Sequence, residues 1–225
     1  MKAKILLTTT LLFCIFTLSN AQIIKNTLLL GGAANFYSTS NPQVQYNAYQ
    51  FKSAYTNVQI GKAVKENTVV GLILSYTYSN QHPKNFPDSS FGKYNEYRVG
   101  VFYRKYKKLL KELYFFGEVD ASYIYSQNSQ GTLQNGSDKT KIISNGGAVS
   151  FVPGISYGIC KRLQLELSMP SIISLTYQSS KINYNTPMPS NINTKGNNFS
   201  FNANLNPNFL SNFGIGFKFL LGKQD

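Results

Sequence analysis

The sequence has little cysteine, and beyond its first residues it has no long apolar run. Cys14 and Cys160 are its two cysteines. Because we expect Cys14 to be removed with a leader segment, Cys160 is left alone in the mature chain, and an internal disulfide is excluded. No uninterrupted apolar run near twenty residues follows Gln22, so we expect no membrane-spanning helix. Something other than disulfides must stabilise the fold.

The N-terminus has the composition of a secretory signal peptide. Lys2 and Lys4 supply the charged start, residues 5–18 are almost wholly apolar, and Ser19 and Ala21 place small residues where signal peptidase cuts. We therefore predict a signal peptide over residues 1–21 and one mature domain over residues 22–225. An N-terminal membrane anchor, or a lipoprotein modified at Cys14, is the alternative.

Acidic residues are scarce. The chain has 9 Asp and Glu against 22 Lys and Arg and a formal net charge of +13, which falls to +11 when Lys2 and Lys4 are removed (13 minus 2). The basic residues are scattered, and an exported protein rarely meets nucleic acid, so we expect no nucleic-acid partner. We expect the positive charge to attract outer-membrane lipid headgroups or lipopolysaccharide instead.

What the sequence has in quantity is strand-forming residues in a period of two. In residues 94–104, Tyr97, Val99, Val101 and Tyr103 alternate with Glu96, Arg98 and Arg104, and similar alternation recurs in later segments. We predict strands at 28–38, 50–62, 68–79, 94–106, 113–126, 146–160, 163–178 and 199–221. Short connections at 63–67, 107–112 and 161–162 alternate with long polar loops at 39–49, 79–93, 127–145 and 179–198.

Alternate short turns and long loops are typical of transmembrane barrels. Apolar residues then face outward, polar residues and small glycines face a narrow lumen, and tyrosines at Tyr76, Tyr78, Tyr123, Tyr125, Tyr157 and Tyr177 form an interfacial girdle. The fold class is therefore an all-β, antiparallel, up-and-down barrel of about eight strands. A barrel of that size is filled by side chains. We expect a structural ion-pair network inside it, made by Glu96, Arg98, Glu118, Asp120 and Glu166.

The terminal segment from Asn212 to Phe219, with Phe213, Ile215 and Phe217 in alternation, resembles the closing strand of small bacterial outer-membrane β-barrel proteins. These are the OmpA-like and OmpX-like group found widely among Bacteroidetes. The resemblance implies an integral protein of the cell outer membrane, with short turns in the periplasm and four long loops outside. It also implies assembly by the barrel-assembly machinery, which reads a late aromatic such as Phe219, and a monomeric state.

We predict no catalytic, cofactor-binding or metal site, and no enzyme activity. His82 with Ser79 or Ser89 gives the sharpest enzymatic alternative, a lipid A deacylase or acyltransferase, but a lone histidine in a polar loop is usually only solvated. One histidine and one distant cysteine do not make a metal site. The expected function is a structural, adhesive or surface-binding role through the extracellular loops, with a lipid-modifying enzyme or an accessory factor for protein secretion as alternatives.

Overall fold

The computed structural model describes residues 23–41, 49–83, 90–132, 139–169, 171–185, 193–203 and 214–222. The predicted signal peptide lies outside the described residues. The described residues form ten strands: β1 (Leu28–Asn41), β2 (Tyr49–Lys65), β3 (Thr68–Pro83), β4 (Ser90–Lys108), β5 (Leu113–Thr132), β6 (Lys139–Cys160), β7 (Leu163–Ser168), β8 (Ile173–Asn185), β9 (Asn193–Ala203) and β10 (Gly214–Leu221). Among these residues, no helix is long and apolar enough to cross a membrane.

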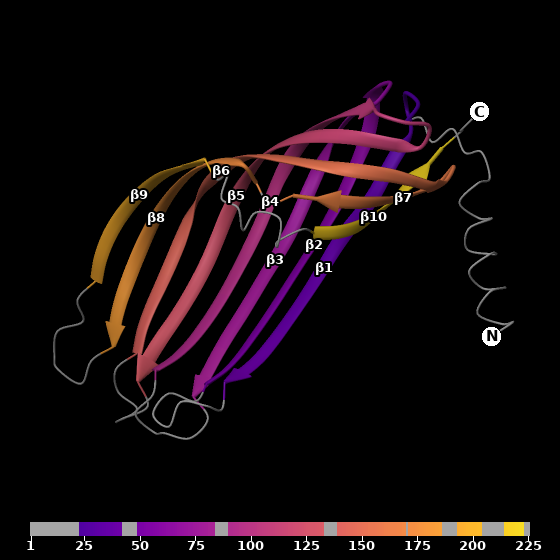
Figure 1. Cartoon of the computed structure of the whole chain (residues 1–225). Coiled ribbons are helices and arrows are strands. Elements are labelled where there is room, and N and C mark those ends of the chain that lie inside the picture. The colour runs from indigo at the N-terminus through magenta and orange to yellow at the C-terminus, as the bar shows by residue number, and fades with distance from the viewer. Residues whose placement is uncertain are drawn as a thin grey trace, which may run out of the picture.

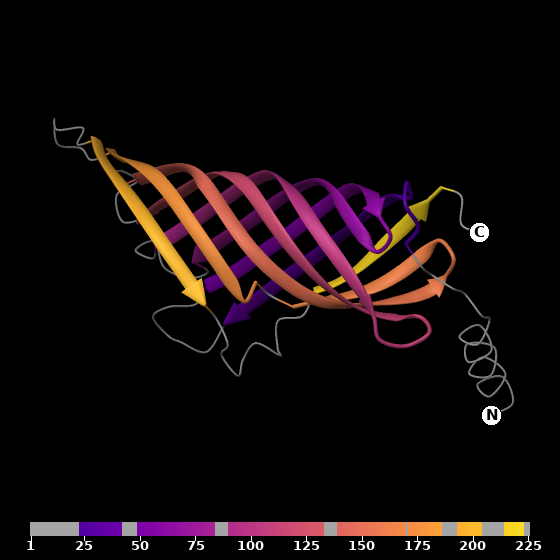
Figure 2. The same ribbon diagram turned by 90° about the horizontal axis from the view of Figure 1, so that it is seen from above.

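The strands form a closed antiparallel barrel. Strands β1 to β6 pair in chain order, β6 pairs with both β7 and β8, and β10 closes the ring between β7 and β1. The strands run obliquely around the barrel (Figures 1 and 2). Because β7 and β8 share one position beside β6, and β10 and β9 share the next, the ring has eight positions. The prediction of an eight-stranded barrel is confirmed.

Two predicted strands are each divided into two. The segment 163–178 leaves the ladder between β7 and β8, where the Met169 and Ile172 amides donate to carbonyls of β6 at 2.9 and 3.0 Å. Ser168 lies opposite Gly154, and Ile173 lies opposite Phe151. The segment 199–221 is divided into β9 and β10. The pairings described for β9 involve β8 alone, and those of β1 beyond Gly32 involve β2 alone.

The prediction of four long loops is wrong in large part, because the strands run through much of the predicted loop sequence. Strand β5, for example, extends to Thr132, β6 already begins at Lys139, and the two remain paired over that length. Polar composition indicated loops, but the backbone pairing of neighbouring strands continues through this polar sequence. The short connections lie near their predicted places. We call their end of the barrel the short-turn end and the opposite end the loop end.

The two faces of the wall have the predicted sidedness. Leu72, Val99 and Val101 point outward and are 59%, 50% and 56% exposed. Arg104, Glu118 and Glu166, which alternate with outward apolar residues, are buried inside. Cys160, which the alternation places inward, is instead exposed, because the register shifts between Gly158 and Cys160 at the end of β6. The wall is thus apolar outside and polar inside.

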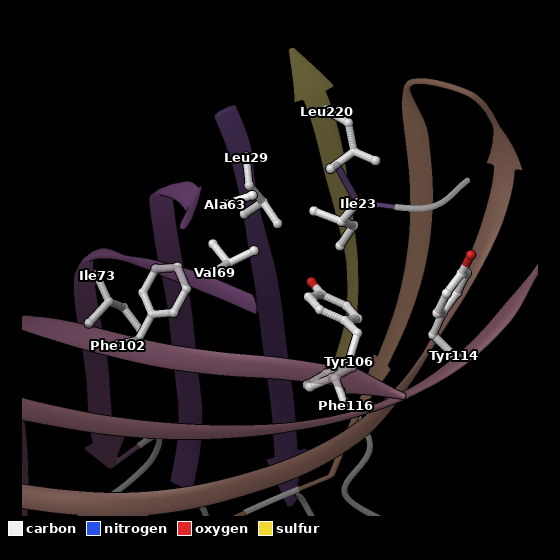
Figure 3. Packing of buried hydrophobic residues seen from close by; sticks show 10 residues of the cluster. All are labelled: Ile23, Leu29, Ala63, Val69, Ile73, Phe102, Tyr106, Tyr114, Phe116 and Leu220. Atoms are coloured by element: carbon white, nitrogen blue, oxygen red, sulfur yellow. The ribbon is translucent and has the colours of Figure 1, made fainter. Parts of the chain in front are cut away.

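An apolar cluster fills the lumen at the short-turn end. Its members are buried and come from the segment before β1 and from six strands: Ile23, Leu29, Ala63, Val69, Ile73, Phe102, Tyr106, Tyr114, Phe116 and Leu220 (Figure 3). Ile23 is tied to the wall because its carbonyl accepts from the Asn67 amide at 3.0 Å. Tyr106 packs edge-on against Tyr114, with ring centroids 6.5 Å apart. The cluster closes this end of the barrel.

Inward glycines allow neighbouring strands of the wall to approach each other closely, so a larger residue at such a position should destabilise the barrel. At Gly71 an added Cβ would overlap the backbone of Ile60 and Gly61, which has no room to move. Gly71→Ala is therefore expected to lower the free energy of unfolding by about 1–3 kcal/mol. The control is Gly92→Ala, where a Cβ meets nothing within 4 Å. Urea midpoints measured in detergent micelles check this, and equal midpoints for the two variants would contradict it.

Candidate functional site

The lumen holds a network of polar side chains centred on Arg104. Its Nε donates to Glu118 Oε2 at 2.7 Å, and its Nη1 donates to both carboxylate oxygens of Glu166 at 2.7 and 2.8 Å. Strand β4 places Arg104 directly opposite Glu118 on β5. Glu166 comes from β7, which is not a neighbour of β4 in the ring. The guanidinium therefore connects strands across the interior rather than along the wall.

Three further side chains complete the network. The Tyr106 hydroxyl accepts from Arg104 Nη1 at 3.0 Å and donates to Glu166 Oε1 at 3.1 Å. Gln59 on β2 donates to Glu118 Oε1 at 3.0 Å and accepts from Arg104 Nη2 at 3.1 Å. Lys218 on β10 donates to Gln59, and its Nζ lies 3.7 Å from Glu166 Oε2. Five strands, β2, β4, β5, β7 and β10, thus meet at one point.

The network is buried and balanced in charge. Two cations, Arg104 and Lys218, meet two carboxylates, Glu118 and Glu166, and all four side chains are at most 5% exposed. The Phe116 ring stacks beside the guanidinium, with its centroid 4.3 Å from Arg104 Cζ. Ions removed from water are tolerated only when paired and hydrogen-bonded in this way. Together with the apolar cluster, the network plugs the lumen toward the short-turn end.

The structure divides the five residues of the predicted network. Glu118 and Glu166 come together, although through Arg104 rather than through Arg98. Glu96 pairs with Arg98 on its own strand, at 3.4 Å, and accepts from the Tyr94 hydroxyl at 2.5 Å. Asp120 lies apart and accepts from Ser150 Oγ at 3.3 Å. The register separates these groups, because Glu96 lies opposite Ser126 and Arg98 lies opposite Ile124.

Four members of the network were missed, namely Arg104, Lys218, Gln59 and Tyr106. For Arg104 a signal was present, because alternation places it on the inward face. Its partner was not predictable in the same way, because counting back from the predicted connection 107–112 brings Arg104 opposite Phe115, whereas the observed register brings it opposite Glu118. For Lys218 the alternation gives the face but not the partner, since β10 and β4 are not neighbours. Contacts across the lumen depend on how the barrel closes, so they cannot be predicted by counting residues between neighbouring strands.

Above the plug lies a polar cavity of about 710 Å³. Its floor includes Arg104, Glu118 and Lys218, and Glu96, Arg98 and Asp120 line its wall. Tyr37, which shares the inward face of β1 with Leu29, is 55% exposed, so the lumen is open to solvent farther toward the loop end. Among the described residues, the barrel is therefore a cup, closed at the short-turn end and open at the other.

The described part of the chain does not bring Ser79 and His82 together. Ser79 and His82 both lie in β3, three residues apart, and therefore point to opposite faces of the wall. Ser89 falls outside the described residues. Within the described ranges, no group of three or more His, Cys, Asp or Glu side chains is placed to hold a metal ion. What the arrangement can do is stabilise the barrel and present a polar interior.

The plug predicts a large difference between two arginines on one strand. Arg104→Gln leaves Glu118 and Glu166 buried without their main partner, so we expect the free energy of unfolding to fall by about 3–5 kcal/mol. Arg98→Gln is the control, because the side chains of Arg98 and Glu96 are 29% and 17% exposed, and we expect a loss below about 1 kcal/mol. Urea titration of the barrel in micelles measures both. Similar losses for the two variants would show that the network is not what stabilises the barrel.

Comparison with known proteins does not assign the chain to a family: no protein-family model matches it, and no curated protein sequence is a significant match. The function therefore has to be inferred from the sidedness of the barrel, its plug and its open end.

Proposed function

We propose that the chain is an integral outer-membrane β-barrel that serves as a plugged surface anchor with a binding role at its loop end. The observation that carries this proposal is the inverted distribution of polarity. Charged side chains such as Arg104, Glu118 and Glu166 are buried, whereas Leu72, Val101 and Ile215 are 59%, 56% and 62% exposed. In water such an apolar belt would be a liability. In hydrocarbon it is the required surface of a closed barrel.

The order of residues along the outward face supports a membrane position. On β3, Leu72 and Leu74 are followed toward the loop end by Tyr76, Tyr78 and then a polar residue. On β8, Ile173 and Leu175 are followed by Tyr177 and then by Ser179 and Lys181. Aromatic rings with one polar end favour the boundary between hydrocarbon and headgroups. The tyrosines therefore mark the outer interface, and the wall continues beyond it.

A conducting role is disfavoured by the plug, because ions crossing the barrel would have to displace a buried, fully paired network and an apolar cluster beneath it. The surface for binding is instead the open cup and the polar strand ends around it. Strand β5 supplies Gln127, Asn128 and Ser129 there, and β8 supplies Ser179 and Asn183. Rigid strands, rather than the long loops expected from the sequence, would present these groups to a partner.

The membrane position predicts a large and a small loss of stability for arginine at two places on one strand face. Val101 and Asn95 both point outward from β4, with Val101 in the apolar belt and Asn95 beyond Tyr97. We expect Val101→Arg to lower the free energy of unfolding in lipid vesicles by about 2–4 kcal/mol and Asn95→Arg to lower it by about 1 kcal/mol or less. Denaturant titration in vesicles measures both. In a soluble barrel an arginine at position 101 would be tolerated, and that result would overturn the proposal.

The protein should also behave as a membrane barrel in direct tests. We expect it to stay in the carbonate-washed membrane pellet and to migrate differently on gels with and without boiling. Planar bilayers containing it should show no steady conductance. A salt-soluble species without a heat-dependent shift would contradict the membrane position, whereas steady conductance would contradict the plug alone.

A further inference from the structure

The outward faces of five strands carry a lysine just beyond the apolar and aromatic residues, on the side of the loop end. These residues are Lys52 on β2, Lys93 on β4, Lys141 on β6, Lys181 on β8 and Lys195 on β9, and all five are exposed. We call them the lysine collar. On β4, for example, the outward order toward the loop end is Val101, Val99, Tyr97, Asn95 and Lys93.

Strand register shows that the collar is organised rather than scattered. Lys52 lies opposite Asn80, and Asn80 lies opposite Lys93. The row continues from Lys93 to Ser129 and from Ser129 to Lys141. Lys181 lies directly opposite Lys195 on the next pair of strands. Cross-strand partners share one face of the sheet, so three lysines of this row, separated by single neutral residues, point outward together.

No opposite charge accompanies them on the outer wall of the described strands. The carboxylates of the wall, Glu96, Glu118, Asp120 and Glu166, all take the inward positions. The remaining described acids, Glu66 and Glu112, lie in connections at the short-turn end. Like charges placed side by side repel one another. Such a row is therefore expected where an anion neutralises it.

Below Lys52 and Lys93, with Ala54 and Asn95 between, the outer wall is hollowed into an apolar groove of about 420 Å³, within the usual size range of small-molecule pockets, about 300–1,000 Å³. It spans β2 to β5 and is lined by Val58, Leu74, Val99 and four tyrosines, Tyr76, Tyr97, Tyr123 and Tyr125. Three of the tyrosines form a continuous aromatic row, with ring centroids 5.1 Å apart for Tyr76 and Tyr97 and 6.4 Å apart for Tyr97 and Tyr125. An apolar slot beneath a row of cations matches one kind of ligand.

We propose that the groove and the lysine collar above it bind a phosphorylated lipid of the outer leaflet, with an acyl chain in the groove and phosphate groups between Lys52, Lys93 and Lys141. This inference rests on the proposed membrane position. Charge complementarity selects a phosphorylated headgroup of net negative charge over a zwitterionic one, in which an ammonium group already balances the phosphate. The groove selects a lipid over free phosphate, because its lining offers acyl chains an apolar surface.

The test measures lipid binding to the detergent-extracted full barrel by native mass spectrometry, with bisphosphorylated lipid A and phosphatidylcholine as probes. The triple variant K52Q/K93Q/K141Q is expected to bind lipid A about 10- to 100-fold more weakly than the unaltered protein does. K52R/K93R/K141R should retain the affinity. The matched control is K62Q/K105Q/K161Q, which removes the same charge at the short-turn end and should change the affinity less than about twofold.

The groove is tested separately with Tyr97→Ala, which removes the central ring of the aromatic row. This variant should bind lipid A about two- to tenfold more weakly. Inorganic phosphate at millimolar concentration should not compete. Equal affinity for lipid A and phosphatidylcholine, equal losses in the two glutamine triples, or competition by free phosphate would each overturn the inference.

The proposed membrane position is checked independently. Insertion into phosphatidylcholine vesicles with heat-modifiable migration supports the barrel even if lipid A binding fails. Failure to insert into any vesicle defeats the membrane position itself.

Discussion

The ion-pair network around Arg104 is the interaction on which the interior of this barrel depends. A ring of eight strand positions fixes backbone pairing along the wall, but nothing in that pairing connects opposite sides. Arg104 does so by reaching from β4 to Glu118 on β5 and to Glu166 on β7, and Lys218 adds β10. Because the ions are buried, each is tolerated only while its partners stay in place. The same contacts that stabilise the interior therefore close the lumen toward the short-turn end.

The two-residue period of strands made much of this fold predictable. Alternation in residues 94–104 assigned Val99 and Val101 outward and Arg104 inward, and the structure confirms these faces. Strand ends were less predictable. The segments 127–145 and 179–198 were expected to be loops because they are rich in polar residues, yet β5, β6 and β8 run through much of them. Above the apolar belt the wall meets water on both faces, so hydrophobic alternation, the signal that identifies a strand, disappears while the backbone pairing continues.

The sequence predicted which acidic residues lie inside the barrel, but it did not predict how the site is arranged in space. Alternation places Glu118 and Glu166 inward, and the need to pair them follows from burial. Which cation serves them depends on register and closure. The sequence predicted Arg98 as the cation of this network. The pairing of β4 with β5 instead places Arg98 opposite Ile124 and Arg104 opposite Glu118. The contact from Arg104 to Glu166, separated by 62 residues, crosses the lumen, and no local pattern encodes such a contact.

The break between β7 and β8 has a consequence for how this chain tolerates change in length. From Gly154 to Phe151 on β6 there are three steps, whereas from Ser168 to Ile173 on the facing chain there are five. The facing chain thus has two more residues than β6 over this break. Because two is an even number, Leu167 before the break and Ile173 after it both point outward. Insertions or deletions at this point are thus compatible with the barrel in steps of two. If the pairing of β8 with β6 shifted by one residue, Leu175 and Tyr177 would face the polar interior and Gln178 would face the apolar outer side. A change of one residue here therefore has to be absorbed by a bulge, whereas a change of two does not.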